Sequence, residues 1–163
     1  MSMALIKGLS VGFVIVCPSG VLVGHTTGSD HWDVPKGRLD PGEEPLEGAK
    51  RELTEETGLS WVDVRRGSVG ELQQTELVCK FSGARYPIVK FRDLGQHEYT
   101  KRKDLHLFEL TLAADINANA LKCESLVDRG SYSFPELDRF TLVTSNLSKH
   151  LTPNLYLWLK AHM

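Results

Sequence analysis

The stretch GRLDPGEEPLEGAKRELTEETGL, residues 37–59, decides the fold because it joins a turn-rich loop to a helix. Pro45 suits a first helical turn and Gly58 stands where helices commonly end, so a helix is predicted over 45–57. Its apolar stripe consists of Leu46, Ala49 and Leu53. Residues 28–42 are rich in Gly, Asp and Pro and predict a long loop, and such loops in a compact domain usually have a function.

Three glutamates lie late in this helix, at positions i, i+3 and i+4: Glu52, Glu55 and Glu56. Their side chains share an arc of about 100° beside the apolar stripe. Carboxylates near the C-terminus of a helix are disfavoured by its dipole, and these three also repel one another. A bound divalent cation would remove both costs, and oxygen ligands without His or Cys favour Mg²⁺ or Mn²⁺ over zinc. The alternative is a solvated acidic face.

The same glutamates belong to a longer string. Gly37 is followed six residues later by Glu43, and residues 51–59 then read Arg-Glu-Leu-Thr-Glu-Glu-Thr-Gly-Leu. This resembles the signature of the Nudix hydrolases, which is Gly, five residues, Glu, seven residues, and Arg-Glu-aliphatic-x-Glu-Glu-x-Gly-aliphatic. Every fixed position is met. The resemblance implies an α+β fold, an α/β/α sandwich with a mixed central sheet, in which residues 37–59 form the catalytic loop-helix-loop.

The resemblance also implies roles for these residues. It makes metal ligands of the Gly37 backbone carbonyl and of the side chains of Glu52, Glu55 and Glu56. Arg51 and Glu43 would pair to brace the loop against the helix, and the alternative is a surface ion pair worth under about 1 kcal/mol. Family members often add a distant carboxylate shortly before a strand. Glu136 is the candidate, and Glu98 and Glu109 are the alternatives.

The family's reaction is hydrolysis of a nucleoside diphosphate linked to another moiety. Water attacks a phosphorus atom, so the site needs cations that neutralise the developing charge and a base that activates the water. We expect Mg²⁺ or Mn²⁺ as cofactor. Glu52 is the expected base, and Glu136 or Glu98 is the alternative.

Charge is unevenly distributed along the chain. Residues 80–103 contain seven Lys or Arg and two acidic residues, whereas residues 37–59 contain three basic and seven acidic residues. An acidic metal site beside a basic segment suits a Mg²⁺-polyphosphate ligand. The alternative is a basic sheet edge that prevents aggregation.

The lead-in to the signature, His31-Trp32-Asp33-Val34-Pro35-Lys36-Gly37, narrows the substrate. Its Trp-x-x-Pro-Lys-Gly run resembles the dinucleoside tetraphosphate hydrolase branch, which implies phosphate contacts from His31, Lys36 and Lys103. The further expected substrate contacts are Arg38, Lys101 and Arg102, with Tyr99 or Phe108 as a platform for adenine. Trp32 and Phe108 could instead belong to the core.

Several substrates and one inactive form stay open. Nucleoside triphosphates, ADP-ribose, dinucleotide cofactors, inositol polyphosphates and the triphosphate end of RNA suit the same chemistry. A non-catalytic nucleotide-binding module is a further alternative, although such modules typically lose one or more acids of the helix, and all are present here.

Strands are predicted by β-rich runs on both sides of this segment. Residues 11–17 and 21–25 flank Pro18-Ser19-Gly20 as a hairpin. Four further runs favour strands: 61–64, 76–81, 86–91 and 105–112. Residues 147–162 predict a closing helix, whereas 113–131 are polar and predict no element. This element order indicates an α+β class.

Length and composition fit one globular domain over residues 1–163, with 41% hydrophobic and 25% charged residues. The net charge of −2 argues against a surface built wholly for nucleic acid, although a local basic patch stays open. The three cysteines form neither CxxC nor a Cys/His cluster, so neither a zinc site nor a disulfide framework is expected.

The apolar run at residues 9–17 could be mistaken for a signal sequence. It is followed by Pro18-Ser19-Gly20 in place of a small-residue cleavage site, so a buried strand is the better interpretation. No run approaches the roughly 20 apolar residues of a membrane span. We therefore expect a cytoplasmic enzyme with a small nucleotide as its partner and no membrane attachment.

Overall fold

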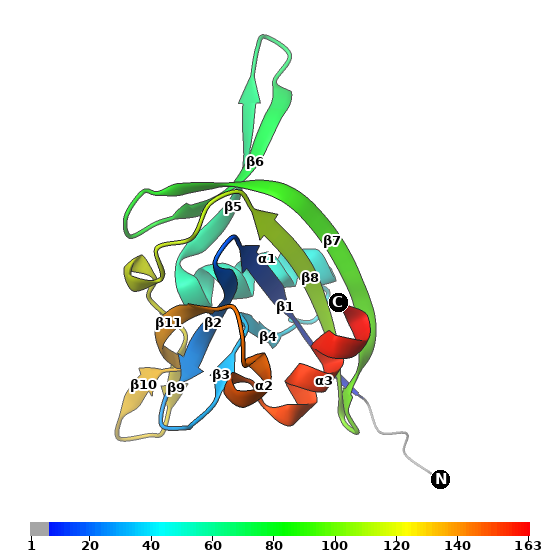
Figure 1. Cartoon of the computed structure of the whole chain (residues 1–163), viewed down its shortest axis with the longest axis vertical. Helices are drawn as coiled ribbons and strands as arrows, with labels where there is room; N and C mark the ends of the chain where they lie inside the picture. Colours follow the sequence, from blue (N-terminus) through cyan, green and yellow to red (C-terminus); the bar gives the residue numbers. More distant parts are fainter. Residues whose placement is uncertain (1–6) are drawn as a thin grey trace.

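The computed structural model describes residues 7–163, and a mixed sheet forms its centre (Figure 1). The strand order is β11-β2-β1-β8-β7-β6-β5. These strands are β1 (Gly8–Cys17), β2 (Gly20–Thr26), β5 (Leu59–Arg66), β6 (Glu71–Cys79), β7 (Arg85–Thr100), β8 (Lys103–Leu112) and β11 (Leu137–Val143). Strands β1 and β8 are parallel, and every other neighbouring pair is antiparallel. The predicted hairpin of β1 and β2 is confirmed.

Helices cover both faces of this sheet. Helix α1 (Pro45–Thr57) packs on one face, where Ala49 and Leu53 meet Phe13 and Ile15 of β1. The short α2 (Leu147–His150) and α3 (Pro153–His162) pack on the other face, over Val14 and the β8 residues facing that side. Because β1 is covered on both faces, its sequence is almost continuously apolar and lacks the alternation of a half-exposed strand. The expected α/β/α sandwich is confirmed.

The loop before α1 passes between two strands that have separated. Strands β1 and β2 pair only at Val16–Val21 and Cys17–Gly20. Beyond those pairs, β4 (Lys36–Arg38) lies against β1, and β3 (Trp32–Asp33) lies against β2. The turn-rich segment predicted over 28–42 therefore contains two short strands, which hold it against the sheet.

Two expectations about element length were wrong. The closing helix is broken: Thr152 is extended because it precedes Pro153, so α2 ends at His150 and α3 begins at Pro153. Strands β5, β6 and β7 extend well past the β-rich runs, and β5 with β6 forms a hairpin that projects from the body (Figure 1). Its outer residues are exposed and mostly polar, with only Val69 and Leu72 as large apolar side chains there, so no alternating apolar pattern indicated strands.

The segment 113–131, for which no element was predicted, forms a small structure of its own. It contains the 3₁₀ helix η1 (Ala118–Ala120) and β9 (Leu126–Asp128), which pairs with β10 (Ser133–Pro135) in a separate two-stranded ribbon. Among residues 7–163, no helix is long and apolar enough to cross a membrane.

Candidate active site

Two glycines bring the loop onto the sheet and the helix. A Cβ on Gly12 of β1 would lie 2.2 Å from the Pro35 carbonyl oxygen, so only glycine lets the loop cross there. A Cβ on Gly37 would lie 2.1 Å from the carboxyl carbon of Glu52. The Glu52 carboxylate is therefore in direct contact with the backbone at Gly37. Loop and helix meet at Glu52, one of the two buried acids of the signature.

Arg51 ties these parts together through its guanidinium group. It donates to the Glu43 carboxylate from Nε at 3.0 Å and from Nη2 at 3.1 Å, and Nη2 also donates to the Arg38 carbonyl at 2.9 Å. Nη1 donates to Glu52 at 2.9 Å and to Glu55 at 3.2 Å. The hydrogen bonds from Arg51 lower the pKa of Glu43. The resulting network braces the loop against α1.

Two of the three helix glutamates are buried. Glu52 is 7% exposed and Glu56 is 3% exposed, and Glu56 accepts a hydrogen bond from the Lys36 backbone N–H at 3.1 Å. Burial raises the pKa of both carboxyl groups, and the adjacent Glu136 carboxyl group raises that of Glu56 further. Glu55 is different, because its side chain is 45% exposed and contacts Arg51.

The carboxylates of Glu52, Glu55 and Glu56 are the type of ligand that a divalent cation binds, but they are not grouped around one position. Within residues 7–163 no three His, Cys, Asp or Glu side chains are arranged as a ligand group. Glu52 and Glu55 are instead paired with Arg51. By contrast, Glu56 and Glu136 form no ion pair within residues 7–163 and so lack a compensating positive charge. A hard cation among Glu52, Glu56 and Glu136 would supply it, and oxygen donors are the ligands that Mg²⁺ and Mn²⁺ prefer.

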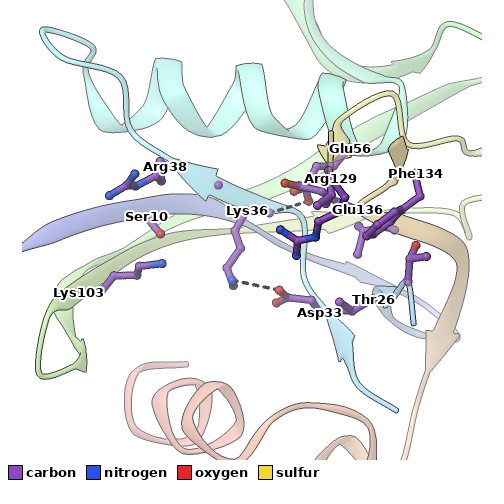
Figure 2. Close-up of a pocket in the computed structure, with 14 residues that line it drawn as sticks. Ser10, Thr26, Asp33, Lys36, Arg38, Glu56, Lys103, Arg129, Phe134 and Glu136 are labelled. Atoms are coloured by element: carbon purple, nitrogen blue, oxygen red, sulfur yellow. Dashed lines mark hydrogen bonds and ion pairs between the residues drawn. The ribbon is translucent and has the colours of Figure 1, made fainter. Parts of the chain in front are cut away.

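An open pocket of about 410 Å³ adjoins the acids. Figure 2 shows Glu56 and Glu136 at one end, Arg38 and Lys103 at the other, and Lys36 between them. The Lys36 ammonium group pairs with Asp33 at 3.0 Å. Burial, together with the charges of Lys36 and Arg38, lowers the pKa of Lys103. One pocket thus combines a carboxylate end with a cationic end.

Four predicted substrate contacts lie outside the lining of this pocket. His31 is exposed in the turn before β3, and Lys101 and Arg102 are exposed in the turn between β7 and β8. Tyr99 packs on the α3 side of the sheet, where its ring lies 5.7 Å from the Lys36 ammonium nitrogen.

The alternative candidates also lie elsewhere. Phe108 is 3% exposed and belongs to the core under α1, so the expectation that it could carry adenine was wrong and the core alternative holds. Trp32 packs at the edge of the core on the α3 side. Glu98 pairs with Lys7 at 2.7 Å and Glu109 with Arg92 at 2.8 Å, and neither lines the pocket.

Sequence reasoning missed several residues of the pocket wall: Ser10, Thr26, Thr27, Asp33, Val127, Arg129, Phe134 and Leu137. Asp33 lies within residues 31–37, which lead into the signature, and its spacing from Lys36 could have indicated that it lies in the pocket. Arg129 and Phe134 come from the polar segment around the β9–β10 ribbon, which has no periodicity that would reveal a shared face. These residues come from segments far apart in the sequence, and the pairing of the folded chain brings them to one pocket wall.

Comparisons with known proteins agree with this geometry. The NUDIX domain family model matches residues 7–143. The chain is 28% identical over 162 residues to an uncharacterized 17.7 kDa protein of Enterobacteria phage T4, covering 92% of this chain and 91% of that protein. A MutT protein from Methanosarcina mazei has the same fold, with a TM-score of 0.57, 18% identity and coverage of 99% and 96%.

Two enzymes match over a shorter stretch. The RNA pyrophosphohydrolase of Brucella anthropi is 48% identical over 50 residues, which is 31% of this chain and 27% of that enzyme. The asymmetrical bis(5'-nucleosyl)-tetraphosphatase of Mus musculus is 51% identical over 39 residues, or 24% and 26% of the two chains. The chain thus matches only about a quarter of the length of either enzyme. The family model extends over residues 7–143, which is most of the chain, so the protein belongs to the Nudix family and is a Nudix hydrolase.

Proposed function

We propose that this Nudix hydrolase uses Mg²⁺ or Mn²⁺ to hydrolyse a phosphoanhydride bond of a dinucleoside polyphosphate such as diadenosine tetraphosphate. The observation that carries the proposal is that one pocket has Glu56 and Glu136 at one end, Arg38 and Lys103 at the other, and Lys36 between them. Such a pocket fits a chain of phosphates that is neutralised by metal at the reacting end and by ammonium and guanidinium groups along its length.

The cation would be held by the Gly37 carbonyl and by carboxylates of Glu52, Glu55, Glu56 and Glu136. It would supply Lewis-acid neutralisation of the charge that develops when water attacks phosphorus. Arg51 and Glu43 keep the loop and the helix in register. Of the carboxylates considered for the base, Glu136 is favoured over Glu52, because Glu136 lines the pocket whereas Glu52 is hydrogen-bonded by Arg51.

Two observations support a dinucleoside polyphosphate as the substrate: the Trp-x-x-Pro-Lys-Gly run before the signature and the short match to the mouse tetraphosphatase. A second candidate substrate is the triphosphate end of RNA, supported by the match to the Brucella RNA pyrophosphohydrolase and by exposed Lys101 and Arg102 beyond the pocket. The two are separated by incubating the protein and Mg²⁺ with each substrate and resolving the products. We expect ATP and AMP from diadenosine tetraphosphate. Faster release of pyrophosphate from triphosphorylated RNA would instead support the second candidate.

The metal assignment is tested with Glu56→Gln, which keeps the shape of the side chain and removes its charge. Loss of a metal ligand is expected to lower kcat by at least about 100-fold with the fold intact. Glu47→Gln is the matched control, since Glu47 lies on the same helix with a side chain that is 64% exposed and that pairs with Lys50 at the surface. Equal activity of the two variants would refute the assignment.

A further inference from the structure

The ribbon of β9 and β10 presents one of its faces to the pocket. Phe134 of β10 is the register partner of Val127 of β9, and both line the pocket. Side chains alternate along a strand, so Arg129 and Glu136, two residues further along each chain, share this face, and they too line the pocket. The opposite positions Leu126, Asp128 and Ser133 line a separate hollow on the outside.

The ribbon is fixed at its base, where β9 begins and β10 ends, to α1 and to the turn after β2. The Glu55 carbonyl of α1 accepts hydrogen bonds from the backbone N–H groups of Glu124 at 2.8 Å and Ser125 at 3.1 Å. The Thr27 hydroxyl donates to the Pro135 carbonyl at 2.6 Å, and the Thr27 N–H donates to the Glu136 carbonyl at 3.1 Å. The ribbon therefore holds its pocket face at a defined place relative to the helix acids.

The pocket face of the ribbon carries an aromatic side chain, Phe134, and a basic one, Arg129. Phe134 is half-buried, and its ring lines the pocket that also contains Glu56 and Glu136. The ring of Tyr132, which lines the outer hollow, lies 6.1 Å from it at an interplanar angle of 24°. The guanidinium group of Arg129 points into the pocket (Figure 2). It forms no ion pair with any residue in the range 7–163. A flat apolar surface next to an uncommitted cation is chemically suited to a heteroaromatic ring attached to a phosphate.

We propose that this face is the nucleoside subsite, in which Phe134 stacks on the base and Arg129 binds the phosphate next to the ribose. The inference rests on the proposed function in that it takes a nucleotide as the ligand, and it adds which residues recognise the nucleoside. Stacking accepts any base because every base has a π-face. The subsite therefore distinguishes a nucleotide from a sugar phosphate more strongly than one base from another.

The test compares the dissociation constants of AMP and ribose 5-phosphate, measured by calorimetry with Mg²⁺ present. The base is expected to make AMP bind about 5- to 150-fold more tightly than ribose 5-phosphate, the range that corresponds to stacking on one aromatic side chain. Phe134→Ala is expected to bring this ratio near one, and Phe134→Tyr to preserve it. Arg129→Gln should weaken both ligands by a similar factor, so the ratio stays unchanged.

Leu126→Ala is the matched control, because Leu126 is 60% exposed on the outer face of the same ribbon. It should leave both constants unchanged. Phe134→Leu keeps an apolar side chain without a flat face and serves if the alanine variant unfolds; its ratio should also fall near one. A ratio near one in the unaltered protein, or an unchanged ratio in Phe134→Ala or Phe134→Leu, would overturn the subsite. Binding is measured without turnover, so this result is independent of whether diadenosine tetraphosphate is hydrolysed.

Discussion

Replacing Gly37 with alanine should separate the loop from the helix acids. The added Cβ would stand 2.1 Å from the Glu52 carboxyl carbon and 2.1 Å from its Oε2 atom, whereas ordinary contacts begin at 3.4 Å. The carboxylate must therefore retreat by the difference, 3.4 − 2.1 = 1.3 Å. Metal–ligand distances tolerate only about 0.2 Å, and a misplacement of about 1 Å in a catalytic group can cost roughly 100-fold in rate. A hundredfold loss corresponds to about 2.7 kcal/mol of transition-state stabilisation.

The assay combines calorimetric titration of Mg²⁺ with kcat/KM for diadenosine tetraphosphate. Gly37→Ala is expected to weaken Mg²⁺ binding and to lower kcat/KM by about 100-fold. Gly8→Ala is the control, because its Cβ would meet only the Arg102 carbonyl oxygen at 3.8 Å, an ordinary contact. Wild-type Mg²⁺ affinity and turnover in a folded Gly37→Ala protein would refute the argument that the contact between Gly37 and Glu52 positions the metal ligands.

Two further predictions concern the charges around α1. Arg51→Lys should lower the free energy of unfolding by about 2 kcal/mol in urea titrations. One ammonium group cannot replace the contacts that Arg51 makes with Glu43, Glu52 and the Arg38 carbonyl. Unchanged stability would show that this network does not brace the loop against α1. The raised pKa of Glu56 means that the metal-free folded state binds an extra proton, so stability is full below the carboxyl's ordinary pKa and falls as pH rises through the raised value. Mg²⁺ replaces that proton, and its increase in Tm should be larger at pH 8 than at pH 6; an equal increase would contradict the linkage.

Much of the site was predictable because it is local. The helix at 45–57, its late glutamates and the pairing partners Arg51 and Glu43 lie within 23 residues, where helical geometry and short loops determine which side chains are neighbours. The hairpin of β1 and β2 and the strand β8 likewise follow from apolar runs and turn residues. These features were predicted correctly because each depends on spacing along a short segment.

Contacts between distant segments were not predictable in the same way. Glu136 was the candidate for the distant carboxylate, with Glu98 and Glu109 as alternatives. In the folded chain Glu136 lies beside Glu56 at the pocket, while the other two pair with basic residues. Lys36 enters the pocket and His31 does not, because β4 lies against β1 whereas His31 stays in the turn outside it.

The sequence by itself determined the fold class, the family and the acid-bearing helix, since periodicity and short-range spacing specify them. Only the tertiary structure decided which remote side chains complete the pocket, including Arg129 and Phe134 from a segment without periodicity. The physical reason is that sheet register and strand separation depend on packing of the whole chain, and no local pattern records them.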